Sequence, residues 1–82
     1  MRLDKYLKVS RIIKRRPVAN EACDAGRVVV NGKIARASYD VKVDDVIELT
    51  LGARTVKARV VSVNEYAKKD EAAMMYEIIE EK

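Results

Sequence analysis

The hydrophobic positions at the start of the chain recur with the period of an α-helix. Lys5, Lys8 and Arg11, each three residues apart, share the side opposite the apolar residues. Arg2 lies near the boundary between the two faces. The pattern predicts an amphipathic helix over residues 2–13 whose polar face is almost purely basic. Its core-facing side is expected to consist of Leu3, Tyr6, Leu7, Ser10 and Ile13.

A second helix is expected around Pro17, because proline is favoured in a first helical turn, where its missing N–H costs no hydrogen bond. Gly26 is the expected residue after the helix end, since glycine readily adopts the left-handed conformation found there. The link between the two helices, residues 14–16, is entirely basic, and we expect a tight corner that directs its three side chains outward. Close packing is expected through Val18, Ala19, Ala22, Cys23 and Ala25.

From Arg27 onward the pattern is typical of β-strands. Asn31 and Gly32 stand between two runs of β-forming residues, which is a strong signal for a tight hairpin. A second pair of strands is expected in DVIELTL and RTVKARVVSV, joined around Gly52. Because polar residues alternate with apolar ones in the latter stretch, one side of this antiparallel sheet should be solvated.

The end of the chain is acidic and less regular. Asp70 is expected to cap a short helix that begins at Glu71, with acidic side chains at its positive end. The stretch YEIIEEK, residues 76–82, fits either a continuation of that helix or a last strand. The pattern leaves these two alternatives open.

Charge is distributed unevenly along the 82 residues. Residues 1–16 carry seven basic and one acidic side chain, whereas residues 70–82 carry one basic and five acidic side chains. Crowded, exposed cations repel one another and contribute little to folding. The basic segment therefore indicates a polyanionic partner. A solvated basic helix without a partner is the simplest alternative.

The composition leaves little room for catalysis. The chain has no histidine and a single cysteine, Cys23, which excludes an internal disulfide, the common zinc sites and histidine-based catalysis. Asp44 and Asp45 are adjacent carboxylates, but they fall in an expected turn with no acid, base or metal partner nearby in sequence. We therefore expect a non-catalytic protein without metal or cofactor, in which Cys23 is a small buried hydrophobic residue.

Nucleic acid and an anionic membrane surface compete as the polyanion. A helix lying in a membrane interface usually carries Trp or Phe anchors, which this chain lacks, and the apolar face here is needed to close a small core. The longest apolar run, residues 72–76, is far too short to span a bilayer. These features favour nucleic acid and a cytoplasmic location. RNA is favoured over DNA, because no segment is typical of a recognition helix that reads base edges.

Three stretches, RLDKYL, RRPVANEACDAGRVVVNG and SYDVKVDDVI, resemble the S-four RNA-binding domain, or alpha-L motif, over about residues 1–50. The remainder, EYAKKDEAAMMYEIIEEK, resembles the heat-shock protein fifteen group, without its long basic C-terminal helix. This compact form is similar to the RqcP family of ribosome-associated quality control. The resemblance implies an α+β fold in which two N-terminal helices pack on a small antiparallel sheet, followed by a short C-terminal helix. It also implies one domain over residues 1–82, with the core motif at 1–50 and a hairpin and acidic tail at 51–82.

The same resemblance implies a function in ribosome-associated quality control. Members bind a free large ribosomal subunit that still holds a peptidyl-tRNA, and they contact rRNA and tRNA. An elongating partner, RqcH, then adds an alanine tail to the failed chain. No small-molecule substrate, cofactor or membrane takes part. By matching position, the family's RNA-contact residues fall on Arg2, Lys5, Lys8 and Arg16, with Arg11 and Arg15 as expected helpers.

Three other functions stay open. The chain could be a general rRNA-binding factor of ribosome assembly or recycling. It could be a detached RNA-targeting domain that acts with a separate RNA-modifying enzyme. It could also be a protein-interaction module with no role on RNA.

Two positions depart from the family pattern. Arg15 stands where the family often has a Ser or Thr that caps the second helix, which forfeits a cap worth roughly 1 kcal/mol and adds a cation. Asp44 stands where the family has glycine in a turn. Because aspartate tolerates the left-handed conformation better than most residues, a positive φ is predicted at Asp44.

Overall fold

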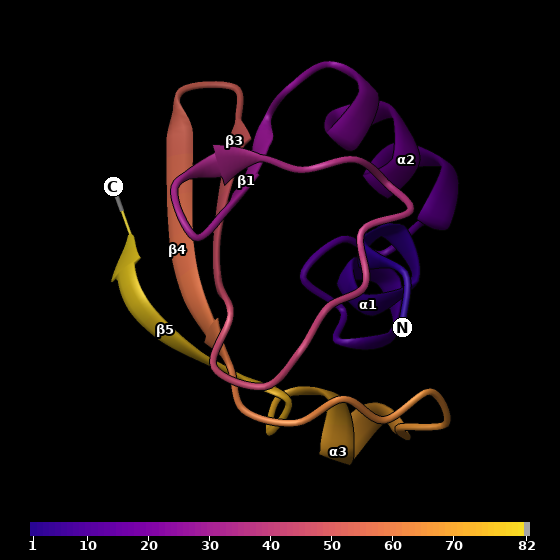
Figure 1. Ribbon diagram of the computed structural model, residues 1–82. Coiled ribbons are helices and arrows are strands. Elements are labelled where there is room, and N and C mark those ends of the chain that lie inside the picture. Colours follow the sequence, from indigo (N-terminus) through magenta and orange to yellow (C-terminus); the bar gives the residue numbers. More distant parts are fainter. Residues whose placement is uncertain (82) are drawn as a thin grey trace.

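The computed structural model describes residues 1–81 and contains helices on one side of an antiparallel sheet. Figure 1 shows α1 and α2 on one side of the sheet, with α3 beyond one end of it. The α+β class and the alpha-L arrangement are therefore confirmed. The helices are α1 (Leu3–Val9), α2 (Arg16–Asp24) and α3 (Lys69–Ala72). The strands are β1 (Val28–Val30), β2 (Lys33–Ile34), β3 (Val46–Leu51), β4 (Arg54–Val60) and β5 (Tyr76–Glu81).

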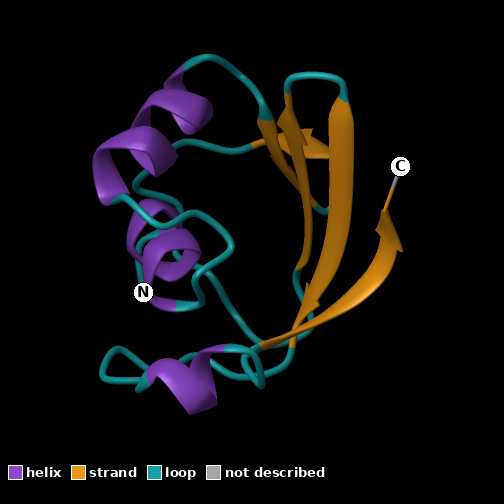
Figure 2. Ribbon diagram, turned by 180° about the vertical axis from the view of Figure 1, so that it is seen from behind, coloured by secondary structure: helices purple, strands orange, loops and turns teal. Residues whose placement is uncertain are grey.

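The five strands form one sheet in the order β2-β1-β3-β4-β5, and every neighbouring pair is antiparallel. Strand β3 lies at the centre and pairs with β1 on one side and with β4 on the other, as Val28↔Leu49 and Ile47↔Ala58 show. Strand β5 runs along the free side of β4. The register of this pair shifts between Lys57 and Ala58 of β4. In Figure 2 the helices and the sheet enclose the space that the core side chains fill. The solvated sheet side predicted for β4 is consistent with this layering.

The core is built from aliphatic side chains around one tyrosine. Tyr6 of α1 is fully buried, and its hydroxyl donates a hydrogen bond to the carbonyl oxygen of Met75 over 2.7 Å. This bond joins the first helix to the segment that enters β5. Each large apolar side chain buried here contributes roughly 1.5–3 kcal/mol. The other large apolar side chains with almost no exposure are Leu3, Leu7, Leu49, Met75, Val28 and Val60.

Helix α1 is shorter than the predicted span of residues 2–13. It ends at Val9 because Arg11 takes a left-handed conformation, with φ 63°. The Arg11 N–H donates to the carbonyl of Lys8, and the Ile13 N–H donates to the carbonyl of Leu7, so the helix end is still hydrogen-bonded. Ser10 and Ile13 are buried as expected, although a turn rather than a helix directs them to the core.

Helix α2 begins and ends as the sequence predicts. Pro17 lies in its first turn, and Arg15 precedes the helix without a side-chain capping hydrogen bond. Gly26 has φ 73° and donates its N–H to Cys23, while Arg27 donates to Ala22, which closes the helix in a Schellman motif. The packing face is narrower than predicted, because Val18 and Ala25 lie at its margin and are exposed. The buried part of the face is Ala19, Ala22 and Cys23.

Both predicted hairpins are present. Asn31 and Gly32, with φ 52° and 83°, connect β1 to β2, and Gly52 lies in the turn between β3 and β4. The predicted cap at Asp70 is wrong: α3 begins two residues earlier than expected, after Lys68, and Asp70 lies inside its first turn. An acidic side chain there still faces the positive end of the helix.

The alternative left open at the end of the chain is decided in favour of a strand for residues 76–81, because these residues pair with β4. Residue 82 lies outside the described residues. Among residues 1–81, no helix has the length and apolar character needed to cross a bilayer.

The turn before β3 is held by a buried carboxylate. Asp44 has φ 76°, as predicted, and Asp45 is 8% exposed. The carboxylate of Asp45 accepts hydrogen bonds from the Asn31 amide (2.9 Å), the Tyr39 hydroxyl (2.8 Å) and the Lys42 N–H (3.0 Å). Burial raises the pKa of Asp45, but these hydrogen bonds outweigh it and hold the pKa below its ordinary value. Asp45 is therefore a structural carboxylate that connects the first hairpin to the central strand.

Candidate nucleic-acid interface

One buried carboxylate organises the basic side of the two N-terminal helices. Asp4, in the first turn of α1, is 2% exposed. Its Oδ1 accepts hydrogen bonds from the Nε of Arg2 (3.2 Å) and the N–H of Lys5 (2.8 Å). Its Oδ2 accepts from the Nε of Arg16 (3.4 Å) and the Nδ2 of Asn20 (3.3 Å). Both carboxylate oxygens are thus satisfied by donors from α2 and from the start of α1.

The charge of Asp4 is stable in this setting. Burial raises the pKa of Asp4, but the hydrogen bonds from Arg2, Asn20 and Lys5, together with the charge of Arg16, outweigh it and lower the pKa. Asp4 therefore stays ionised at neutral pH. Two arginines surround this single negative charge, so the cluster keeps a net positive charge.

Arg2 and Arg16 each bind Asp4 with part of the guanidinium group and expose the rest of the side chain to solvent. Their side chains remain 52% and 47% exposed while their Nε atoms face Asp4. A guanidinium has five N–H donors in a planar fork, so donors remain available to a phosphate. Because the arginine positions are set before binding, less side-chain entropy is lost when a ligand arrives. The two residues come from separate segments of the sequence and meet through Asp4.

Two more of the predicted residues, Lys8 and Arg11, lie together at the end of α1. Both are exposed, and with Lys14 they line a surface hollow against residues 65 and 67 of the loop after β4. In sequence, Lys5 lies between Asp4 and Lys8. Its Nζ is 3.7 Å from Oε1 of Glu65. Its charge is therefore partly offset.

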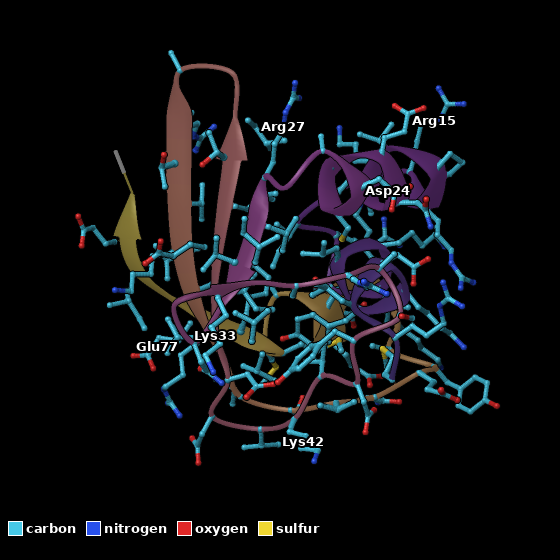
Figure 3. The ribbon with its side chains drawn as sticks, turned by 45° about the horizontal axis from the view of Figure 1, so that its top comes forward. Arg15, Asp24, Arg27, Lys33, Lys42 and Glu77 are labelled. Atoms are coloured by element: carbon cyan, nitrogen blue, oxygen red, sulfur yellow. The ribbon has the colours of Figure 1, made fainter. Side chains whose placement is uncertain are left out.

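Arg15 precedes α2, at the outward corner predicted for residues 14–16, and all three side chains there are exposed. Figure 3 shows Arg15 at the end of α2 away from the sheet, whereas Arg27 lies at the opposite end beside β1. The six predicted residues thus form two groups on the helical side. One group is Arg2 and Arg16 around Asp4, and the other is Lys8 and Arg11 at the hollow. Lys5 and Arg15 lie next to these groups in sequence.

The cations on the outer side of the sheet are arranged differently. Arg59 donates to Asp44 over 2.7 Å and to Glu77 over 2.9 Å, and Lys57 pairs with Glu48 at 3.4 Å. These pairs neutralise their charges locally. On the helical side, by contrast, positive charge exceeds the acidic charge available to offset it. Positive charge is therefore concentrated at α1 and the start of α2, where residues 1–16 carry seven basic side chains and one acidic one.

Sequence reasoning missed three residues of this surface. Asp4 is recognisable in the sequence as the lone acidic residue of a basic segment, but nothing in the pattern indicated that it would be buried. Asn20 carried no pattern that linked it to α1. Arg36 is exposed in the loop after β2 and lines a second hollow together with Arg2 and Asn20. This hollow extends the basic surface toward the first hairpin.

Fold and surface together define the class of protein. A family model described as the S4 domain matches residues 1–47, which include α1, α2 and the first hairpin. The trimeric structure of Vibrio cholerae Heat Shock Protein 15 superimposes with a TM-score of 0.87 at 28% identity, covering 95% of this chain and 80% of that one. The chain is thus an S4-domain protein with the fold of heat-shock protein fifteen.

Curated relatives narrow this class. Two proteins named RQC P-site tRNA stabilizing factor, from Streptococcus pneumoniae and Bacillus subtilis, are 54% and 49% identical to this chain over 81 residues. The matches cover 99% of this chain and 92% and 94% of the relatives. The chain belongs to the family of RQC P-site tRNA stabilizing factors. The resemblance to the quality-control branch of the S-four proteins is thereby confirmed.

Proposed function

We propose that this protein is a non-catalytic RNA-binding factor of ribosome-associated quality control. It binds a stalled large ribosomal subunit that carries peptidyl-tRNA, contacts rRNA and tRNA, and supports C-terminal alanine tailing of the nascent chain. The name shared by its relatives supports this function, as does the S4 domain at residues 1–47. The observation that carries the proposal is the pair of half-exposed arginines held on Asp4 between α1 and α2.

The proposed mechanism is electrostatic grip by a rigid surface. Arg2 and Arg16 present guanidinium donors whose direction is set by Asp4, and guanidinium groups bind phosphate oxygens in a bidentate manner. The sheet holds α1 and α2 in place through a shared core that includes Tyr6. Phosphates on a folded RNA then meet cations that need little rearrangement. The remaining proposed contacts are Lys5, Lys8, Arg11 and Arg15.

The geometry of the carboxylates supports a binding role rather than a catalytic one. Asp4 and Asp45, the buried carboxylates among the described residues, each accept several hydrogen bonds and have lowered pKa values. A general base or acid needs a pKa near the working pH and a free oxygen. Neither carboxylate meets these requirements.

The wider setting is part of the same proposal. Alanine tailing requires an elongating factor, which we propose to be RqcH, and the ribosomal partner places the protein in the cytoplasm. Residues 1–82 act as one domain, in which the core motif contacts RNA. Glu77 of β5 pairs with Arg59 of β4, so its charge is offset within the sheet.

Co-sedimentation with isolated large ribosomal subunits tests the function. The protein should pellet with subunits that carry peptidyl-tRNA in the P site and much less with vacant subunits. Equal binding to both would contradict a role at the tRNA and would indicate a general rRNA-binding assembly or recycling factor. No binding to either would contradict the proposal as a whole. Recovery of an RNA-modifying enzyme with the protein would indicate a detached targeting domain instead.

A further inference from the structure

Tyr66 is an aromatic residue that the fold does not use. It lies in the loop between β4 and α3, and its side chain is 86% exposed. The other three tyrosines are engaged: Tyr6 is buried in the core, and Tyr39 and Tyr76 are partly buried. Single exposed apolar groups are common on protein surfaces, so the exposure of Tyr66 gains meaning only from its surroundings.

The loop that carries Tyr66 is held in place by polar contacts. The Asn64 side chain accepts a hydrogen bond from the Tyr66 N–H over 3.0 Å and donates one to Glu71 over 3.5 Å. Glu65 lies 3.7 Å from Lys5, which connects the loop to α1. Figures 1 and 2 show this segment passing beside the end of the molecule where α1 lies. Tyr66 is therefore presented to solvent from an organised turn.

The residues on either side of Tyr66 form part of a basic hollow. Glu65 and Ala67 line it from the loop, and the facing wall consists of α1 and the turn that follows it. The cations of that wall are exposed, and their side chains form no ion pair with another described residue. These cations are Lys8, Arg11 and Lys14.

We propose that this hollow is a binding site for an unpaired stretch of RNA, with one nucleobase stacked on Tyr66 and the flanking phosphates on Lys8, Arg11 and Lys14. Tyr66 does not itself line the hollow, but it lies between Glu65 and Ala67, which do. A basic groove with an exposed aromatic residue next to it is the arrangement that proteins use for single-stranded nucleic acid. Duplex RNA could satisfy the cations, but its stacked bases could not reach the tyrosine. The inference rests on the proposed RNA-binding function and adds to it a preference for an unpaired base.

Binding of fluorescein-labelled ten-nucleotide RNAs tests this site, with oligo(U) and oligo(A) compared against a ten-base-pair duplex. Tyr66→Ala should weaken binding of the single strands roughly 5- to 100-fold, the loss expected for one stacked base. Tyr66→Phe should bind like the original protein, because the ring suffices. Duplex affinity should not change with Tyr66→Ala. Met74→Ala, which removes another exposed apolar side chain, is the matched control and should have no effect.

Salt and fluorescence separate stacking from charge. Tyr66→Ala should leave the dependence of affinity on salt unchanged, whereas Lys14→Ala should reduce its slope by about one phosphate. The chain has no tryptophan, so Tyr66→Trp supplies a single reporter whose emission should be quenched when single-stranded RNA binds.

Two results would overturn the inference. One is unchanged single-strand affinity in Tyr66→Ala, and the other is an equal loss for single strands and duplex. Either result leaves the proposed function standing as long as Arg16→Ala weakens binding to tRNA-carrying large subunits. These experiments can thus disprove the Tyr66 site without disproving the proposed function.

Discussion

The Nε of Arg16 lies 3.4 Å from the Oδ2 of Asp4, so a half-exposed arginine of α2 is anchored to a buried carboxylate of α1. Arg2 donates to both oxygens of the same carboxylate, from Nε to Oδ1 over 3.2 Å and from Nη2 to Oδ2 over 3.5 Å. The expectation that exposed cations contribute little to folding therefore does not extend to these two arginines. Both donate Nε to Asp4, Arg2 also donates Nη2 to it over 3.5 Å, and about half of each side chain remains exposed.

Replacing Asp4 should affect both stability and binding. Asp4→Asn puts an amide in place of one acceptor oxygen, so a donor from α1 or α2 loses its partner. We expect the free energy of unfolding to fall by about 1–3 kcal/mol, as for other buried hydrogen bonds to charged groups. Binding to large subunits should also weaken, because the arginines are no longer fixed. Thermal unfolding and co-sedimentation measure the two effects. Asp24→Asn, on the exposed side of α2, is the control and should change stability little.

Arg16→Ala should lower affinity for tRNA-carrying large subunits roughly 10- to 100-fold, the loss of one or two charge-assisted hydrogen bonds. It should also lower the melting temperature modestly, since Asp4 loses one partner. Lys57→Ala removes the same charge from the outer side of the sheet, where Glu48 already offsets it. An equal loss of affinity in Lys57→Ala would show that net charge, and not the Asp4 cluster, governs binding.

Binding should depend steeply on salt. Each phosphate neutralised by a cation releases counterions, so four to six contacts give a slope of log affinity against log salt of about −3 to −5. Arg16→Ala should reduce the magnitude of this slope by about one. Filter binding or sedimentation across a series of potassium concentrations measures it. Affinity that stays constant from low to physiological salt would contradict an electrostatic grip.

Stability should decline on acidification. The fold holds the pKa of Asp4 and of Asp45 below the ordinary value of 3.8, so the unfolded chain binds these protons more readily. The stability that the two carboxylates contribute is present above the ordinary value and is lost as pH falls through the lowered pKa. The free energy of unfolding should therefore drop most steeply below about pH 4.

Asp45→Asn supplies the check on that pH dependence. The variant should be less stable than the original protein at pH 7, because the carboxylate that accepts from Asn31, Tyr39 and Lys42 is gone. The free energy of unfolding of the variant should also change less as the pH falls below about 5, since one titrating group has been removed. Chemical denaturation at several pH values measures both. A variant curve parallel to that of the original protein would show that Asp45 does not carry the effect.

Local signals in the sequence predicted much of the fold correctly. Asn31-Gly32 and Gly26 mark a turn and a helix end because only a few residues tolerate positive φ without strain. Asp44 was predicted to be left-handed for the same reason. The predicted core face of the first helix was also correct, because the burial of Tyr6 and Leu7 follows from residue type and spacing. Each of these features depends on a few neighbouring residues.

Features that depend on distant residues were either missed or left open. Helix α1 ends at Val9 although apolar spacing continues to Ile13, because the left-handed Arg11 turns the chain toward the rest of the core. The choice of a strand for residues 76–81 depended on the free edge of β4, which a helical or extended pattern of apolar residues could not reveal.

The sequence by itself determined the class of fold, the turns and the concentration of positive charge in the first sixteen residues. Only the tertiary structure decided which cations act together. Asp4 brings Arg2 and Arg16 to one point because the two helices pack closely enough to bury a carboxylate between them. Such a pairing joins residues that are separated along the chain. It stabilises the protein only after folding has brought them together and removed water from the carboxylate.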